Sequence, residues 1–339
     1  GRNNTLLVSD ATVNAPSLTI GYSSTDNAAI LTHNAQVSLS TTNQISVTLG
    51  ANVTARSNRL EVTDGAAISG LRNLTIGLNS TGNSLYVGTN GNVTFGNLFV
   101  GGQNANCSSN SLEINGGLLT TTRTNDKEYN YIGYNGSYNA ASVRNAGVLE
   151  SPHRIYLGAG GTTHFNTLTI SEGGIVRCSD MIIGDNGSSN NVVVVTGPGS
   201  CLLSRGVSPL RIGAGTGCTG NMLAVLDGAF VDAGNSSMGV TYANTSTNNT
   251  MIVSNATVYC TNNMLYAWNQ STITIQGSNS LVRCKDFKLY AGSSLVFEIP
   301  RDGLTAPALD VTGSVTLSAD ARLYVSAREW FAKVGGRLP

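Results

Sequence analysis

The chain repeats one short pattern, which is clearest over residues 166–189. After Asn166, apolar residues such as Leu168 and Ile170 alternate with polar ones, a pair of glycines follows, and a last apolar stretch ends at Gly184. Strict apolar/polar alternation over four or five residues is typical of a half-buried β-strand, and the glycines mark corners. The unit therefore predicts three short strands and a loop.

The same unit can be aligned along nearly the whole chain. Further units begin at Asn4, Asn27, Asn58, Asn83, Asn110, Asn139, Asn191, Asn221, Asn249 and Ser271. Self-similarity at a period of roughly 23 to 31 residues indicates a solenoid, because one turn cannot bury its own apolar side and must stack on its neighbours. Three strands per unit and no helical stretch predict an all-β fold, a single-chain parallel β-helix of about eleven turns, on the order of 50 Å long.

The asparagines that lead the units are expected to stack as an amide ladder. Asn tolerates the left-handed corner conformation, and its side-chain amide both donates and accepts hydrogen bonds. A row of ligands is the alternative that the residue type leaves open.

The recurring N-x-L-x-V-x-x-G unit, closing on L-x-I-G, resembles the right-handed β-helix of pectate-lyase-like proteins. It is more closely similar to the Gly/Asn/Thr-rich repeats of large secreted bacterial surface proteins and autotransporter passengers. The resemblance covers roughly residues 4–294 and implies a right-handed β-helix. It implies no single activity, because that superfamily contains lyases, hydrolases, adhesins and structural rods.

From Leu295 onward the composition changes, because the Asn-led unit stops and longer apolar stretches appear. We therefore predict two parts. Residues 1–294 form the repeat domain, and residues 295–339 form a C-terminal β cap or the start of a further module.

Composition limits the classes of partner. Charged residues are only 11% of the chain and the formal net charge is zero. We expect no nucleic-acid partner, because there is no basic stripe, and no membrane span, because no apolar run is long enough. The chain carries no signal peptide, which indicates a mature or excised form.

Motifs for cofactors, metals and catalysis are missing. The glycine-rich segments 158–161 and 213–217 precede no helix and lack the Gly-Lys-Ser/Thr ending of a phosphate loop. The Asp residues do not form the calcium-binding array of some β-helices. Pectin-type hydrolases of the superfamily typically show Asn-Thr-Asp, Asp-Asp, Gly-His-Gly and Arg-Ile-Lys, and this sequence contains none of them. We expect no cofactor, no metal and no enzymatic activity.

One polar, tyrosine-rich segment is a candidate for contact with a glycan. Its residues are Asp126, Lys127, Glu128, Tyr129 and Tyr131 in one unit and His153 in the next. Tyrosines beside polar groups suit a sugar, and a solvated loop is the alternative.

The chain has six cysteines, Cys107, Cys178, Cys201, Cys218, Cys260 and Cys284. Cys260 and Cys284 occupy the same inward slot of consecutive units, so their Cα atoms should lie about 4.8 Å apart, within disulfide range. Cys178 and Cys201 also fall in adjacent units, one inward step out of register. Buried free thiols are the alternative in both cases. Cys107 and Cys218 are expected in exposed loops.

Several Asn-x-Ser/Thr sequons fall in the loops after the third strand, where a glycan would fit. These candidate N-glycosylation sites are Asn106, Asn135, Asn186 and Asn244. Whether they are modified is left open by the sequence.

The sequence favours a secreted, non-enzymatic β-helix at the cell surface. The first strand, at residues 6–8, starts with nothing ahead of it to cover its edge, and uncovered edges pair with other chains. We therefore expect a surface-layer or fibre subunit that assembles head to tail with copies of itself. The alternatives are a pectate-lyase-like enzyme active on polysaccharide and an adhesin that binds cell-surface or matrix polysaccharide.

Overall fold

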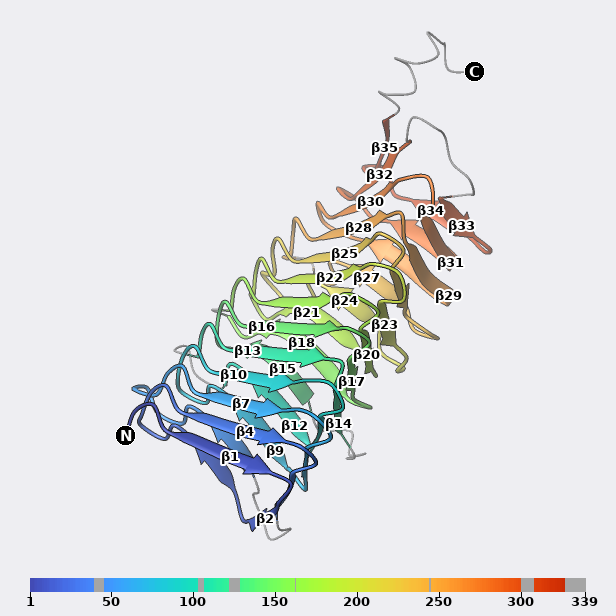
Figure 1. Ribbon diagram of the computed structural model, residues 1–339. Helices are drawn as coiled ribbons and strands as arrows, with labels where there is room; N and C mark the ends of the chain where they lie inside the picture. Colours follow the sequence, from blue (N-terminus) through green and yellow to red (C-terminus); the bar gives the residue numbers. More distant parts are fainter. Residues whose placement is uncertain are drawn as a thin grey trace.

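The structure is a computed structural model that describes residues 1–39, 46–102, 107–121, 129–161, 163–243, 245–299 and 308–326. These residues form 35 strands and no helix, and every strand pairing is parallel. The chain winds as a right-handed parallel β-helix of eleven to twelve turns, which confirms the predicted fold class. Figure 1 shows the resulting rod, with the first strands at one end and the last strands at the other.

Each turn contributes one strand to each of three faces. The first face is a 13-stranded sheet. Its strands are β1 (Thr5–Ser9), β4 (Ala28–Thr32), β7 (Arg59–Val62), β10 (Ser84–Val87), β13 (Ser111–Asn115), β16 (Ala140–Arg144), β19 (Thr167–Ile170), β22 (Val192–Thr196), β25 (Met222–Leu226), β28 (Thr250–Ser254), β30 (Thr272–Gln276), β32 (Ser294–Glu298) and β35 (Arg322–Ser326).

The second face follows a short corner. Its strands are β2 (Thr12–Ala15), β5 (Gln36–Leu39), β8 (Ala67–Ser69), β11 (Asn92–Phe95), β14 (Leu118–Thr121), β17 (Val148–Glu150), β20 (Ile175–Cys178), β23 (Cys201–Ser204), β26 (Phe230–Asp232), the first part of β29 (Thr257–Ala267), the first part of β31 (Leu281–Leu289) and β33 (Leu309–Val311).

The third face completes the turn. Its strands are β3 (Leu18–Ile20), β6 (Ser46–Leu49), β9 (Asn73–Ile76), β12 (Asn97–Val100), β15 (Tyr129–Tyr134), β18 (Arg154–Ala159), β21 (Met181–Asp185), β24 (Leu210–Ile212), β27 (Met238–Val240), the second parts of β29 and β31, and β34 (Val315–Leu317). In β29 and β31 the second and third strands merge, with a register shift between Cys260 and Met264.

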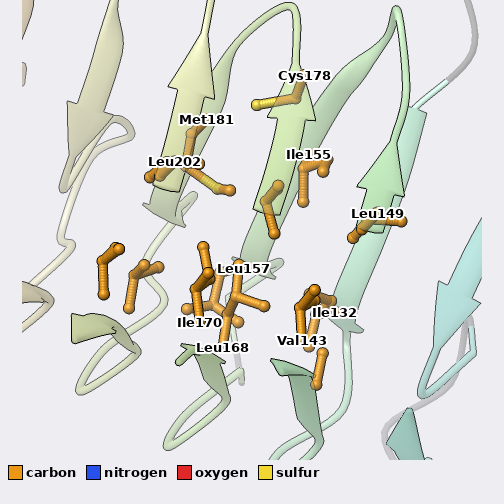
Figure 2. Close-up of a cluster of buried hydrophobic side chains, with 14 of the residues drawn as sticks. Ile132, Val143, Leu149, Ile155, Leu157, Leu168, Ile170, Cys178, Met181 and Leu202 are labelled. Atoms are coloured by element: carbon orange, nitrogen blue, oxygen red, sulfur yellow. The ribbon is translucent and has the colours of Figure 1, made fainter. Parts of the chain in front are cut away.

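Alternation within each strand builds the core. In β19, Leu168 and Ile170 are fully buried while Thr167 and Thr169 are half-buried, because successive side chains of a strand point to opposite faces. The inward residues of all turns form one continuous aliphatic cluster. Figure 2 shows part of it, with Val143, Leu149 and Leu157 pointing into the same interior from three different strands.

The leading asparagines form the expected ladder along this core. In nine consecutive pairs, the backbone N–H and the Nδ2 of one asparagine both donate to Oδ1 of the asparagine one turn on, at 2.9–3.3 Å. The ladder runs through Asn4, Asn27, Asn58, Asn83, Asn110, Asn139, Asn166, Asn191, Asn221 and Asn249. From Asn58 onward these side chains are 0% exposed, so each buried amide is satisfied by its neighbours.

The left-handed corner lies one residue earlier than expected. The residue before each ladder asparagine has a positive φ, and these include Asp26, Ser57, Tyr138 and Phe165 as well as glycines. The asparagine itself therefore starts the strand, and its ladder role depends on the amide alone.

The ladder stops after Asn249, where Ser271 takes the next position and its hydroxyl donates to Val240 O at 3.2 Å. The sheets nevertheless continue. Strand β32 pairs with β30 in register, β35 pairs with β32, and β33 and β34 pair with β31. The boundary expected after residue 294 thus falls within β32, which extends the first sheet, and a separate C-terminal unit stays a prediction. No helix long and apolar enough to cross a membrane occurs in the described part of the chain.

Candidate functional site

A stack of aromatic rings lies on the outer side of the third face. Phe99 in β12 is in register with Tyr131 in β15, which is in register with Tyr156 in β18. The ring centroids are 5.6 and 5.1 Å apart and the planes are within 18° of parallel. Residues at one position of consecutive turns lie one strand spacing apart, and this distance suits ring stacking.

An arginine, Arg154, packs against the tyrosines of this cluster. Arg154 lies over the rings of Tyr129 and Tyr156, at 5.8 and 5.7 Å from their centroids. Its Nε and Nη2 donate to Oδ2 of Asp180 at 3.2 and 3.1 Å, and its Nη1 donates to the Tyr156 hydroxyl at 3.0 Å. The Asp180 side chain is nearly buried. Nη2 of Arg154 also donates to the Ser208 hydroxyl at 3.1 Å, so the guanidinium joins three turns.

The structure places only part of the predicted glycan-contact group in this cluster. Tyr129 and Tyr131 lie in it, whereas His153 is buried, 5% exposed, with its backbone N–H donating to the Ser151 hydroxyl. Asp126, Lys127 and Glu128 lie outside the described residues.

Ring stacking restricts what the cluster can bind. Both faces of Tyr131 are covered, one by Phe99 and the other by Tyr156, so a sugar ring has no free face there. Tyr129, 37% exposed, stands edge-on to Tyr131 and offers the more open ring. The sequence signal for the stack was the recurrence of an aromatic residue at one position of three successive units.

Cys260 and Cys284 are direct register partners in β29 and β31, as expected. Both are buried, and burial raises the pKa of the Cys260 thiol to about 12 and that of Cys284 to about 11. All six cysteines are free thiols. The predicted adjacency is therefore confirmed, while a disulfide has no support in the structure.

The pairing of Cys178 with Cys201 does not fit. Cys178 is in register with Ser204, and Cys201 is in register with Ile175. An offset of three residues puts the two side chains on opposite faces of the sheet, because side chains alternate. Cys178 points into the core and Cys201 is half-exposed.

The expectation of exposed loop positions for Cys107 and Cys218 is also wrong, because both are fully buried. They occupy the position three residues before a ladder asparagine. Ser80 and Ser188 stand there in other turns, where their hydroxyls donate to buried carbonyl oxygens. Cys107 does the same through its thiol, which donates to Leu78 O at 3.0 Å.

A groove with a cavity of about 570 Å³ crosses the corner between the second and third faces. Arg177 and Arg205 line it, and they face Glu150 and Asp232 at 3.8 and 3.9 Å. Cys178 also lines it, but burial raises the pKa of this thiol far above its ordinary value, so it is a poor nucleophile. Within the described ranges, no group of three or more His, Cys, Asp or Glu residues could hold a metal ion.

The sequons fall in different environments. Asn186 is exposed and Asn135 is half-buried, both with a positive φ in the loop after a third strand. Asn106 and Asn244 lie outside the described residues.

No protein-family model matches this chain, and comparison with curated proteins and with solved structures gives no match. The class of protein is therefore defined by the fold alone, a parallel β-solenoid with an asparagine ladder.

Proposed function

We propose that the protein is a structural subunit, an extracellular rod that joins copies of itself end to end in a surface layer or fibre. One observation carries this proposal. Side chains at core positions are buried in the interior turns but exposed in the first and last turns.

At the first turn, Leu6 is 52% exposed, while its register partner Ala29 in the next turn is 1% exposed. At the last turn, Leu317 and Leu323 are 54% and 57% exposed, against 1% and 4% for their partners Leu289 and Leu295. Core positions exposed in this way favour association, because burying apolar area is the main driving force for it.

The two ends are complementary in geometry. Strands β1 and β35 are the outermost strands of the first sheet among the described residues, and each has one unpaired edge. All turns run in the same direction, so a second copy placed one strand spacing beyond β35 brings its β1 alongside in parallel. This contact joins unlike ends, and a contact of that type propagates as a filament unless its rotation closes a ring.

Sedimentation velocity over a range of protein concentrations, with electron microscopy of the same samples, tests the proposal. Wild type should polymerise with concentration, and Leu6→Glu or Leu323→Glu should shift it to monomer, because each places a charge in the contact. Val207→Glu is the matched control, since Val207 is 100% exposed but lies in a loop away from both ends. A wild-type chain that stays monomeric at every concentration contradicts the proposal.

An extracellular location and relation to the pectate-lyase-like superfamily are parts of the proposal. The low charge content and the exposed sequon at Asn186 support the location, and the solenoid fold supports the relation. The alternatives are a polysaccharide-active enzyme and a glycan-binding adhesin. New reducing ends or unsaturated products from a polysaccharide panel favour the enzyme. Glycan binding that is lost in Tyr129→Ala favours the adhesin.

A further inference from the structure

Three arginines on the outer faces of the rod lie over tyrosine rings. Arg154 lies over Tyr156 and Arg283 lies over Tyr259, each at 5.7 Å from the centroid. Arg211 lies over Tyr242 at 4.3 Å. The three can be compared by the groups that bind each guanidinium.

In two of the three, a carboxylate one turn further along the rod binds the guanidinium. Arg283 Nε donates to Oδ2 of its register partner Asp310 at 2.7 Å. Arg154 is bound in the same way by Asp180, which stands at the equivalent position of the next turn.

Arg211 lies over a tyrosine ring, but no carboxylate binds its guanidinium. Its register partner in the next turn is Gly239, which has no side chain. Across the described ranges, the side chain of Arg211 makes no hydrogen bond or ion pair, and its Nε is buried without a partner. A buried donor left unsatisfied is destabilising, so such a group requires an explanation.

The surroundings of Arg211 hold a further polar group. The ring of Tyr266 lies across Gly239, where a Cβ would be 2.4–2.6 Å from its Cζ, hydroxyl oxygen and Cε2. The Tyr266 ring thus covers the position from which an acidic side chain would start, and no hydrogen bond joins its hydroxyl to the guanidinium. Tyr242 is half-exposed, so the site opens to solvent.

We propose that Arg211 is a binding site for an oxyanion, a carboxylate, sulfate or phosphate group carried by a ligand that lies on the third face. The oxyanion supplies the negative charge that Asp180 and Asp310 supply at the other two arginines. Tyr242 packs against the guanidinium, and the Tyr266 hydroxyl lies beside it. This site is independent of the end-to-end assembly proposed above.

Asp185 gives the site a built-in opposing charge. Asp185 lies one turn before Arg211, and the positive charge of Arg211 acts to lower its pKa, yet no hydrogen bond joins the two side chains. Its Oδ1 lies over Gly215 instead, where a Cβ would be 2.6 Å away. Removing this negative charge should strengthen binding of an anion at Arg211, because like charges nearby repel.

The test is titration with sodium sulfate and, separately, sodium acetate, followed by the NMR resonance of the Arg211 Nε–H. Sodium chloride at matched ionic strength corrects for screening. Isothermal titration calorimetry gives affinities for the variants. Arg211→Met removes the charge and keeps the apolar stem, and Arg211→Lys keeps the charge but loses the planar fork.

Saturable binding of either ion should weaken at least about tenfold in Arg211→Met, the loss expected for a charge-assisted hydrogen bond. Arg211→Lys should bind less tightly than wild type and more tightly than Arg211→Met. Asp185→Asn should bind more tightly than wild type. Arg283→Met is the matched control and should bind as wild type does, because Asp310 already occupies that arginine. No saturable response in wild type, or equal binding in Arg211→Met and wild type, overturns the proposal.

Discussion

Gly158 lies directly beneath the side-chain amide of Asn191, which belongs to the turn after next. Gly158 has a φ of 75°, and a Cβ there would lie 2.4 Å from Cγ and Nδ2 of Asn191. The same relationship recurs in eight pairs, Gly21–Asn58, Gly50–Asn83, Gly77–Asn110, Gly101–Asn139, Gly133–Asn166, Gly158–Asn191, Gly184–Asn221 and Gly213–Asn249. In the next turn Thr241 replaces the glycine and Ser271 replaces the asparagine, so glycine and ladder amide are lost together.

The coupling between Gly158 and Asn191 can be measured with a double-mutant cycle. Gly158→Ala should destabilise the protein strongly, since it adds a clash to the strain of a left-handed backbone. Asn191→Ser removes the amide that causes the clash, as in the Thr241–Ser271 pair. We expect the double variant to be more stable than the sum of the single effects by about 1 kcal/mol or more, measured by urea denaturation.

Gly173 provides the control for this cycle. It also has a φ of 75°, but the nearest atom to an added Cβ is 3.9 Å away. Gly173→Ala therefore isolates backbone strain and should be additive with Asn191→Ser. If the effects of Gly158→Ala and Asn191→Ser were also additive, the clash with the Asn191 amide would not be the reason for a glycine at position 158.

The interior of the ladder should contribute strongly to stability. Asn166 Oδ1 accepts hydrogen bonds from the backbone N–H and Nδ2 of Asn139, at 2.9 and 3.1 Å, in a fully buried site. Asn166→Ala removes the acceptor of both bonds and should lower the free energy of unfolding by about 2–4 kcal/mol. Asn262 is the control, because its exposed amide donates to Asn235 of the neighbouring turn at 2.7 Å. Asn262→Ala should change the free energy of unfolding by less than about 0.5 kcal/mol. Equal effects of the two substitutions would show that burial does not matter.

Cys260 and Cys284 are free thiols in the structure, but they are register partners one strand spacing apart. We therefore predict that they form a disulfide when the chain folds with an added disulfide oxidant such as oxidised dithiothreitol. The two thiols lose two protons and two electrons, and the oxidant is reduced to its dithiol. Peptide mapping by mass spectrometry should find this link and none between Cys178 and Cys201. In the folded reduced protein, alkylation of both thiols should be slow, because burial raises the pKa of Cys260 to about 12 and that of Cys284 to about 11. Two free thiols at these positions after oxidative folding would rule the bond out.

Asp185 should make stability depend on pH in the opposite sense from an ion-paired carboxylate. Burial raises the pKa of Asp185 above its ordinary value, although hydrogen bonding and Arg211 act against this. The stability linked to the raised pKa is present below the unfolded pKa and is lost as pH rises through the folded pKa. Asp185→Asn should therefore be more stable than wild type at pH 7 by a few tenths of a kcal/mol, because solvent screens the half-buried group. The advantage should vanish at pH 3 in thermal melts, and an unchanged difference at both pH values would refute this account.

The repeat and the ladder could be predicted from the sequence because both follow from local rules. Alternation around Leu168 and Ile170 decides which side chains enter the core, and a recurring Asn before each first strand places one amide above the next. The adjacency of Cys260 and Cys284 followed from the same reasoning, since their units carry the same slot.

Contacts between side chains of neighbouring turns depend on register, which the tertiary structure decided. The loops differ in length from unit to unit, so the sequence did not reveal that Cys201 faces Ile175 and points outward. The same unequal loops hid the alignment of Phe99, Tyr131 and Tyr156, so their stacking was missed although an aromatic residue recurs at one position of the three units. Arg211 is the sharpest case, since its lack of an acid partner is apparent only when Gly239 is placed beside it by the pairing of β24 with β27.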